Sequence, residues 1–259
     1  MLLAIDVGNT ETVAAVWDGD VLIQDWRLAT ERDVTGDELA SRHEGILRLR
    51  GASLADLDEM VVASVVPTVT PSYELLSRNY LGSEALVLGP GVRTGISLAI
   101  DNPRELGADR LANAVAARDR FDGPSIVVDF GTATTFDAVS GQGEYLGGAI
   151  APGIETSLLA LSQRAARLLT VDLVAPERAI GKSTAESMRS GAVFGTVDMV
   201  DGLIGRFRDE LDGDAAVLAT GGLAGVVAEL SDEIDEHDRL LTLDGLRLVH
   251  ELNREGGGS

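Results

Sequence analysis

The sequence predicts an α/β protein made of two similar halves. Short apolar runs of strand length alternate with longer segments of helical spacing, a pattern typical of mixed α/β domains. Each half begins with a buried strand that ends in Asp-x-Gly, followed by a threonine and a second strand. The chain has 259 residues, of which 45% are hydrophobic, so it can form one large domain or two small ones.

The first half opens with an apolar run at residues 2–5 that ends in Asp6-Val7-Gly8-Asn9-Thr10. Two strands should follow, because the Asp-Gly-Asp turn at residues 18–20 separates two further apolar runs. The next buried strand should stop at Pro67, which has no backbone N–H for a ladder. The predicted elements are strands at 12–17, 21–26, 60–66 and 85–88 and helices at 36–49, 71–80 and 106–121.

The second half repeats this opening about half the chain length later. An apolar run at residues 125–128 ends in Asp129-Phe130-Gly131-Thr132, and a strand and a turn at residues 140–143 follow. The predicted elements are strands at 135–139 and 215–219 and helices at 155–168, 185–211 and 225–230. Two residues alone could match by chance, but the shared strand, turn and hairpin favour a duplication. The repeat predicts two domains, residues 1–120 and 121–259.

The charge of the chain argues against nucleic acid as a partner. The formal net charge is −21, from 21 basic and 42 acidic residues, and phosphate neutralisation needs basic patches. Lys182 is the single lysine. An excess of acidic residues with almost no lysine is typical of proteins from a cytoplasm rich in salt, where screening weakens the repulsion between acidic side chains. A GC-rich genome that favours arginine would also explain the missing lysines.

Several other classes of protein and site are excluded by the composition. There is no cysteine, so neither disulfides nor thiolate metal sites can form. No run approaches the roughly 18 apolar residues of a membrane span, and the N-terminus reaches Asp6 too soon for a signal peptide. We therefore expect a soluble, cytoplasmic protein. The tail at residues 256–259 reads as a linker, and the three histidines form no metal-ligand pattern.

The two Asp-x-Gly segments have the parts of a phosphate-binding turn. A tight turn after a strand presents backbone N–H groups, and glycine lets a phosphate approach closely. A threonine hydroxyl adds a donor, and an aspartate can hold hydrated Mg²⁺. Either copy alone could be an ordinary turn at the end of a strand. Two matched copies, Asp6 to Thr10 and Asp129 to Thr132, predict a pair of turns that hold ATP phosphates from both sides.

Two common phosphate motifs are not present. Gly181-Lys182-Ser183 looks like the end of a P-loop, but that motif requires a glycine where this chain has Pro176. No Gly-x-Gly-x-x-Gly follows a strand, so a Rossmann dinucleotide site is not supported.

Two further segments lie where a strand or loop meets a helix. Gly221 and Gly222 follow a predicted strand and could let a flat base approach the backbone, or could simply start a helix. In Gly107-Ala108-Asp109-Arg110, the aspartate could be a helix cap or a general base. Arg110 in the first helical turn opposes the helix dipole, which indicates another task, such as binding an anion.

Taken together, these motifs resemble one family of enzymes. Asp101-Asn102-Pro103, Pro152-Gly153 and Gly181-Lys182-Ser183-Thr184 complete the set, in order and spacing, with the segments already named. The chain is similar to the type III pantothenate kinases from residue 2 to about residue 253. The resemblance implies two ribonuclease H-like domains of the actin-like ATPase fold. It implies ATP-dependent phosphorylation of pantothenate to 4'-phosphopantothenate, the first step of coenzyme A synthesis.

The resemblance also implies roles for individual residues. Asp109 would be the base that accepts the hydroxyl proton, Asp6 would hold Mg²⁺ through water, and Asp129 would bind a monovalent cation, K⁺ or NH4⁺. The ATP site would comprise Asp6, Gly8, Asn9, Thr10, Gly131, Thr132, Thr134, Thr135, Gly221 and Gly222. Pantothenate would contact Gly107, Arg110 and Thr184. The family resemblance further implies a homodimer.

Three positions depart from the family pattern. The family commonly has asparagine at the position of Glu11, tyrosine at that of Ile100 and proline at that of Leu169. Ile100 puts one pantothenate contact in question. Glu11 directly follows the first phosphate turn, so its carboxylate could repel phosphates, and asparagine there would then tighten MgATP binding. Alternatively, Glu11 could point into solvent, pair with an arginine, or help to hold Mg²⁺.

Two other functions are compatible with these residues. One is a non-catalytic accessory transcriptional regulator of the same fold, since proteins resembling this family have been named as such factors. A regulator that had lost activity would be expected to lack an acid at position 6, 109 or 129, and all three are present. The other is an actin-fold kinase of another small alcohol, which Ile100 makes conceivable.

Overall fold

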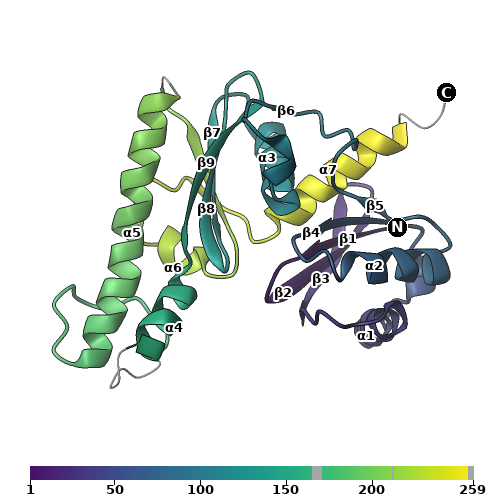
Figure 1. The fold of residues 1–259 in the computed structure, drawn as a ribbon, viewed down its shortest axis with the longest axis horizontal. Helices are drawn as coiled ribbons and strands as arrows, with labels where there is room; N and C mark the ends of the chain where they lie inside the picture. Colours follow the sequence, from purple (N-terminus) through teal and green to yellow (C-terminus); the bar gives the residue numbers. More distant parts are fainter. Residues whose placement is uncertain (165–170, 212, 256–259) are drawn as a thin grey trace. The chain divides into compact units, whose positions relative to one another are not determined.

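A computed structural model of the chain describes residues 1–164, 171–211 and 213–255 (Figure 1). The chain forms two compact units. The first comprises Met1–Gly95, Asn102–Ala116 and the C-terminal segment from Leu241, and the second comprises Ile96–Asp101 and Ala117–Leu240. Each unit has its own sheet.

The first unit is built on a five-stranded sheet with the order β3-β2-β1-β4-β5. β1, β2 and β3 form an antiparallel meander, and β4 and β5 extend the sheet in parallel. The strands are β1 (Leu2–Val7), β2 (Glu11–Asp18), β3 (Val21–Ala29), β4 (Glu59–Ser64) and β5 (Leu86–Val87). The β1–β2 turn therefore lies at the same edge of this sheet as the last residues of β3 and of β4.

Two helices bury one face of the first sheet. Leu3, Ile5 and Val7 alternate along β1 and share a core with the buried side chains of α1 and α2. A capping box between Thr35 and Glu38 starts α1. The helical segments of this unit are α1 (Gly36–Leu49), η1 (Leu54–Asp56), α2 (Thr70–Leu76), η2 (Ser77–Leu81), η3 (Pro103–Glu105), the first part of α3 (Ala108–Arg120), and α7 (Leu241–Glu255).

The second unit repeats the strand order of the first. Its sheet runs β11-β10-β7-β8-β9-β6, so β9, β8, β7, β10 and β11 correspond to β3, β2, β1, β4 and β5. The pairing directions agree as well, because β7, β8 and β9 are antiparallel and β10 and β11 are parallel to β7. The strands are β6 (Ser97–Leu98), β7 (Ser125–Phe130), β8 (Ala133–Val139), β9 (Glu144–Pro152), β10 (Ala216–Thr220) and β11 (Glu236–His237).

Three helices of the second unit share its core with one face of the sheet. They are α4 (Ile154–Arg164), α5 (Thr184–Glu210) and α6 (Ala224–Ala228). Figure 1 shows the long α5 beside the strands of this sheet, and its residues Val197, Val200 and Ile204 pack with Ile126 and Val128 of β7. One face of the strands is thus buried, as their apolar alternation requires.

The structure differs from the sequence prediction in some of its elements and in its domain boundary. The sequence did not predict β9, which follows the turn at residues 140–143, the short strands β6 and β11, or α7 at the C-terminus. The predicted second domain ran from residue 121 to the end, whereas α7 packs on β1, β2 and β4 of the first unit. The predicted helix at 155–168 is present as α4 up to Arg164, and its remainder lies outside the described residues, as do Leu169 and the tail at 256–259.

Among the residues that the structure describes, no helix is both long and apolar enough to cross a bilayer.

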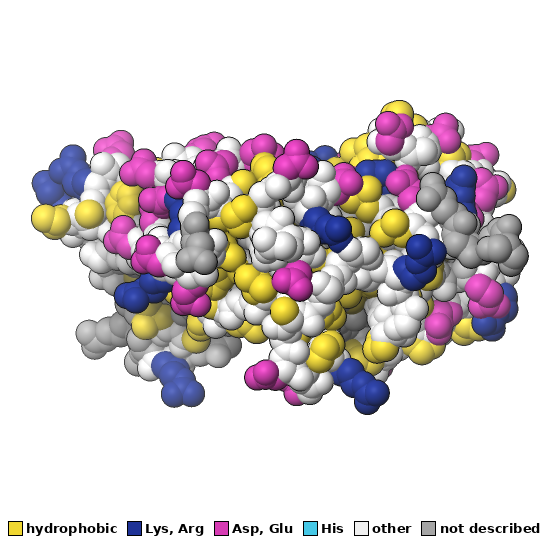
Figure 2. All heavy atoms as spheres, turned by 90° about the horizontal axis from the view of Figure 1, so that it is seen from above, with side chains coloured by type: hydrophobic (Ala, Val, Ile, Leu, Met, Phe, Trp, Pro, Cys, Tyr) yellow, Lys and Arg dark blue, Asp and Glu magenta, His cyan; other side chains and the backbone are white. Residues whose placement is uncertain are grey.

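Acidic side chains are spread over the face of the molecule seen in Figure 2, with basic side chains scattered among them. Because the net charge is −21, repulsion between the acids should destabilise the folded protein in dilute buffer. The screening length falls to about 3 Å at 1 M salt, so the melting temperature should rise between about 0.1 and 2 M KCl. An uncharged osmolyte at matched osmolality is the control, and a flat or falling curve in KCl would contradict the prediction.

Candidate active site

The first turn that the sequence predicts to bind phosphates closes the β1–β2 hairpin. The Gly8 N–H donates to the Glu11 carbonyl at 3.0 Å, and a Cβ at position 8 would lie 2.8 Å from that oxygen. Only glycine fits so tight a turn. Asn9 and Thr10 are exposed, as a ligand-binding turn requires. Asp6 lies half-buried at the end of β1, so the four residues predicted for this turn are together at one edge of the sheet.

Glu11 pairs with an arginine. Its Oε2 atom lies 3.2 Å from Nη1 of Arg27, on the neighbouring strand β3. The two side chains are 56% and 36% exposed, so the pair is a surface ion pair that contributes little to stability. Of the alternatives that the sequence left open for Glu11, pairing with an arginine is the one seen, and this neutralises its charge near the turn.

Glu11→Asn should therefore change MgATP affinity by less than about twofold, because Arg27 already offsets the carboxylate. Arg27→Gln is the matched variant: it leaves Glu11 uncompensated and should weaken MgATP binding at low salt but not at high salt. Titration of both variants with MgATP at two salt concentrations measures this. Several-fold tightening by Glu11→Asn would show that the ion pair does not neutralise the charge.

Asp109 lies close to this same sheet edge. The Val65 N–H, just after β4, donates to the Val7 carbonyl at 3.1 Å, and a Cβ at Gly107 would lie 3.8 Å from Cγ1 of Val65. Within the first unit, the Gly107–Asp109 segment is thus next to the ends of β1 and β4. The sequence-predicted base and the first phosphate turn are brought together by the fold.

The carboxylate of Asp109 is suited to accept a proton. Burial raises its pKa above the usual aspartate range, although the Arg110 N–H, which donates to Oδ1 at 2.8 Å, opposes the shift. A carboxyl group with a raised pKa is a stronger base than an ordinary aspartate. Asp109 is the second residue of α3, and its carboxylate accepts the N–H of the next residue, whereas an N-cap side chain precedes the helix and accepts from two or three residues further on. Of the two roles that the sequence left open, the geometry is not that of an N-cap.

The second phosphate turn closes the β7–β8 hairpin in the same way. The Gly131 N–H donates to the Ala133 carbonyl at 3.0 Å. Oδ1 of Asp129 and the carbonyl of Phe130 would each lie 2.6 Å from a Cβ at Gly221, which has φ +94°. Gly221 at the end of β10 is therefore packed against this turn, and Gly222 beside it is exposed. The structure thus brings the two glycines that were predicted to lie next to the nucleotide base together with the turn that was predicted to bind the phosphates.

The threonines of this segment are not equivalent. Thr132 is exposed and Thr135 is half-buried, with its hydroxyl 3.5 Å from Oδ2 of Asp137. Thr134 is fully buried on the face of β8 that carries Phe136, because side chains alternate along a strand. In the described part of the chain its hydroxyl has no hydrogen-bond partner. The Thr134 side chain therefore faces the core, and its predicted place in the ATP site stays a prediction.

Two residues hold the second turn: Gly153, which the sequence analysis named only as part of a motif, and Thr156, which it did not name. The Thr132 carbonyl accepts hydrogen bonds from the Gly153 N–H at 3.2 Å and from the Thr156 hydroxyl at 2.7 Å. A Cβ at Gly153 would lie 2.4 Å from the Gly131 carbonyl oxygen. The Pro152-Gly153 pair after a strand was the available signal, whereas nothing in the local sequence marks Thr156.

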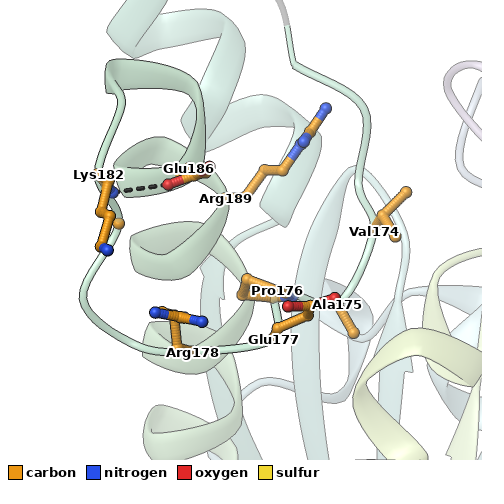
Figure 3. Close-up of a pocket in the computed structure, with 9 residues that line it drawn as sticks. Val174, Ala175, Pro176, Glu177, Arg178, Lys182, Glu186 and Arg189 are labelled. Atoms are coloured by element: carbon orange, nitrogen blue, oxygen red, sulfur yellow. Dashed lines mark hydrogen bonds between the residues drawn. The ribbon is translucent and has the colours of Figure 1, made fainter.

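Thr184, predicted to contact pantothenate, is the exposed first residue of α5. The backbone N–H of Lys182 donates to Glu186 at 2.6 Å, which fixes the loop to the first turn of the helix (Figure 3). A cavity of about 450 Å³ lies between this loop and α5. It is lined by Val174, Ala175, Pro176, Glu177, Arg178, Gly181, Lys182, Glu186 and Arg189.

Comparison with known proteins assigns the family. The family model of the type III pantothenate kinases matches residues 2–206. The chain belongs to the type III pantothenate kinase family. A type III pantothenate kinase of Moorella thermoacetica is 49% identical over 253 residues, which are 98% of this chain and 100% of that protein. Those of Geotalea uraniireducens and Streptomyces griseus are 46% and 48% identical, again over 98% of this chain and over 100% and 98% of their own lengths.

Solved structures confirm the fold of this family member. The ethanolamine utilization protein EutJ of Carboxydothermus hydrogenoformans matches with a TM-score of 0.56 at 15% identity, over 95% of this chain and 89% of that chain. The ROK hexokinase of Thermus thermophilus matches with a TM-score of 0.50 at 14% identity, over 99% of both chains. The predicted α/β actin-like ATPase fold is confirmed, and at these identities the likeness concerns the fold alone.

Proposed function

We propose that the chain transfers the γ-phosphoryl group of ATP to the primary hydroxyl of pantothenate, the first step of coenzyme A synthesis. The observation that carries this proposal is the position of Asp109. It is an acid with a raised pKa, next to the sheet edge that ends in Gly8, Asn9 and Thr10. A kinase needs a base beside the phosphoryl group that it transfers. Family membership supports pantothenate as the alcohol.

In this mechanism the residues of the chain bind, orient and accept a proton. The backbone N–H groups of the two phosphate turns bind phosphate oxygens, and Thr10 and Thr132 add hydroxyl donors. Gly221 and Gly222 leave room for the adenosine group. Gly107, Arg110 and Thr184 hold pantothenate, with the arginine facing its carboxylate. Asp109 accepts the proton of the hydroxyl as this oxygen attacks the γ-phosphorus in line.

Two cations are part of the proposal, and the residues fit them. When bound, Mg²⁺ would neutralise charge that develops on the phosphates, and the single carboxylate of Asp6 fits a hydrated ion of this kind. For K⁺ or NH4⁺, the carboxylate of Asp129 would supply an oxygen ligand, because such cations are held by oxygen atoms. Among the described residues, no group of three or more His, Asp or Glu side chains could hold a metal.

We also propose a homodimer, and the exposed glycines of α5 support this. Gly191, Gly195, Gly202 and Gly205 are exposed on this helix, and a Cβ would meet open space at each. A mid-helix glycine costs up to about 1 kcal/mol relative to alanine, so four of them need a reason. Close approach of another helix backbone would supply one. Exposed apolar side chains of the same unit, at Ile150, Leu159 and Ile180, add surface that a partner could bury.

The activity is tested by measuring ADP release with pantothenate and with a panel of other small alcohols, with and without K⁺. We expect release with pantothenate, accelerated by K⁺, in the cytoplasmic pH range. ADP release only with another alcohol would show that this alcohol, and not pantothenate, is the substrate. No ADP release with any alcohol would favour a non-catalytic regulator. The acids at positions 6, 109 and 129 are all present, so the regulator is not favoured.

A further inference from the structure

One carbonyl group of the second phosphate turn is bonded to the start of a helix. The Thr132 carbonyl accepts a hydrogen bond from the Thr156 hydroxyl at 2.7 Å and a longer one from the Gly153 N–H at 3.2 Å. Thr156 is the third residue of α4, and Gly153 lies between β9 and this helix. The start of α4 is therefore bonded directly to the turn that joins β7 and β8.

The two bonds differ in their dependence on the sequence. The Gly153 N–H continues the β8–β9 ladder by one step, because Ala133 pairs with Pro152 and the next residues in register are Thr132 and Gly153. This bond is made by backbone groups alone. The shorter bond, in contrast, depends on a hydroxyl donor in the side chain at position 156.

The Thr156 hydroxyl donates to another element, whereas other helical hydroxyl groups of this unit donate within their own helix. Ser162, also in α4, donates to the Leu159 carbonyl at 2.8 Å, and Thr196 in α5 donates to the Ala192 carbonyl at 2.6 Å. Such bonds to a carbonyl of the preceding turn are common for serine and threonine in helices. The Thr156 bond instead reaches a residue 24 positions away in the chain, so it constrains the turn and not its own helix.

Holding this carbonyl also fixes the direction of neighbouring groups. The peptide unit between Thr132 and Ala133 is planar and trans, so its C=O and N–H bonds point in opposite directions. Because the carbonyl is directed to α4, the Ala133 N–H is directed away from this helix. The Gly131 N–H is bonded to the Ala133 carbonyl at 3.0 Å. The backbone on both sides of Thr132 is thus constrained, and so is the bond from which the exposed Thr132 side chain extends.

We propose that Thr156 is a positioning residue of the ATP site. Its hydroxyl holds the Thr132 carbonyl so that the N–H groups of the turn and the Thr132 hydroxyl keep the directions in which they bind phosphate oxygens. Donors that are already oriented bind more tightly than donors that must first be ordered. This inference rests on the proposed role of the second phosphate turn.

The exposure of the bond separates this role from a purely structural one. Thr156 and Thr132 are both exposed, so water can replace the Thr156 hydroxyl as a donor to the carbonyl. Loss of the bond should therefore change the free energy of unfolding little. A water molecule does not restrain the direction of the carbonyl, so phosphate binding should be affected more than stability.

The test compares Thr156→Val, which removes the hydroxyl and keeps the shape, with Thr156→Ser, which keeps the hydroxyl. Ser162→Ala is the matched control, since it removes a hydroxyl that donates within the same helix. The dissociation constants of MgATP and of adenosine, the KM for both substrates and the melting temperature are measured.

Thr156→Val should weaken MgATP binding about fivefold, the scale of one net hydrogen bond. Thr156→Ser should stay within about twofold of the wild-type affinity, and Ser162→Ala should bind MgATP as the wild type does. Adenosine affinity and the KM for pantothenate should not change in any of these variants, because the second turn is proposed to hold phosphates.

Wild-type MgATP affinity in Thr156→Val, with or without a lower melting temperature, would overturn the proposal. Equal losses of MgATP and adenosine affinity would also overturn it, because they would indicate a general distortion of the second unit. Should Thr156→Val not fold, Thr156→Ala removes the same hydroxyl and decides in its place.

Thr132→Val separates this inference from the proposed site, because it removes the hydroxyl donor that the second turn is proposed to offer. If Thr132→Val weakens MgATP binding and Thr156→Val does not, only the role of Thr156 fails. If neither variant weakens MgATP binding, the proposed role of the second turn fails as well. If Thr156→Val alone weakens it, Thr156 acts through the backbone N–H groups of the turn, which supports the proposal.

Discussion

Replacing Asp109 with asparagine is expected to reduce turnover by about 10²- to 10⁴-fold while MgATP still binds. Asparagine has the same shape and can still accept the Arg110 N–H bond, so the start of α3 should persist. What it cannot do is accept the proton of the attacking hydroxyl. The loss should therefore be confined to kcat, and the affinities for MgATP and pantothenate should change little.

Asp119→Asn is the matched control, because Asp119 is exposed in the last turn of the same helix. It should retain wild-type turnover. The pH profile adds a second readout: burial raises the pKa of Asp109, so turnover should fall on the acid side at a higher pH than an ordinary aspartate would give. Half of the wild-type turnover in Asp109→Asn would show that the residue is not the base.

The parts of the site that could be predicted from sequence are those set by short-range geometry. A strand, an Asp-x-Gly turn and a returning strand are contiguous, and Gly8 and Gly131 hold their turns by a bond to a residue two or three positions later. The capping box of α1 and the turn at Gly19, with φ +61°, are equally local. Both Asp-x-Gly turns therefore close hairpins of the predicted kind.

The parts that were missed depend on weak local signals or distant contacts. β9 contains Gly147 and Gly148, and glycine has poor strand propensity, so its identity as a strand comes from pairing with β8. α7 belongs to the first unit because Gly245 allows the helix to approach Ala112 of α3, where a Cβ would lie 2.0 Å from the carbonyl oxygen. The burial of the Thr134 side chain was not foreseen, because the strand continues through this residue and turns its side chain into the core.

Gly221→Ala is expected to destabilise the protein by about 3 kcal/mol and to weaken MgATP binding at least tenfold. Position 221 has φ +94°, in the left-handed region that favours glycine. A Cβ there would lie 2.6 Å from Oδ1 of Asp129 and from the Phe130 carbonyl oxygen. Because one of these contacts is backbone, the second phosphate turn must shift to make room, and the proposed cation ligand Asp129 must shift with it.

Gly225→Ala is the matched control, four residues further along. A Cβ at Gly225 would lie 3.6 Å from Cε1 of His237, an ordinary contact, and its position inside α6 favours alanine by up to about 1 kcal/mol. The two variants should therefore move the melting temperature in opposite directions. Calorimetry and MgATP titration, each with and without K⁺, measure the effects. A clash that displaces the Asp129–Gly131 turn would disturb any phosphate site built on it. Wild-type MgATP affinity in Gly221→Ala would therefore show that the end of β10 takes no part in the ATP site.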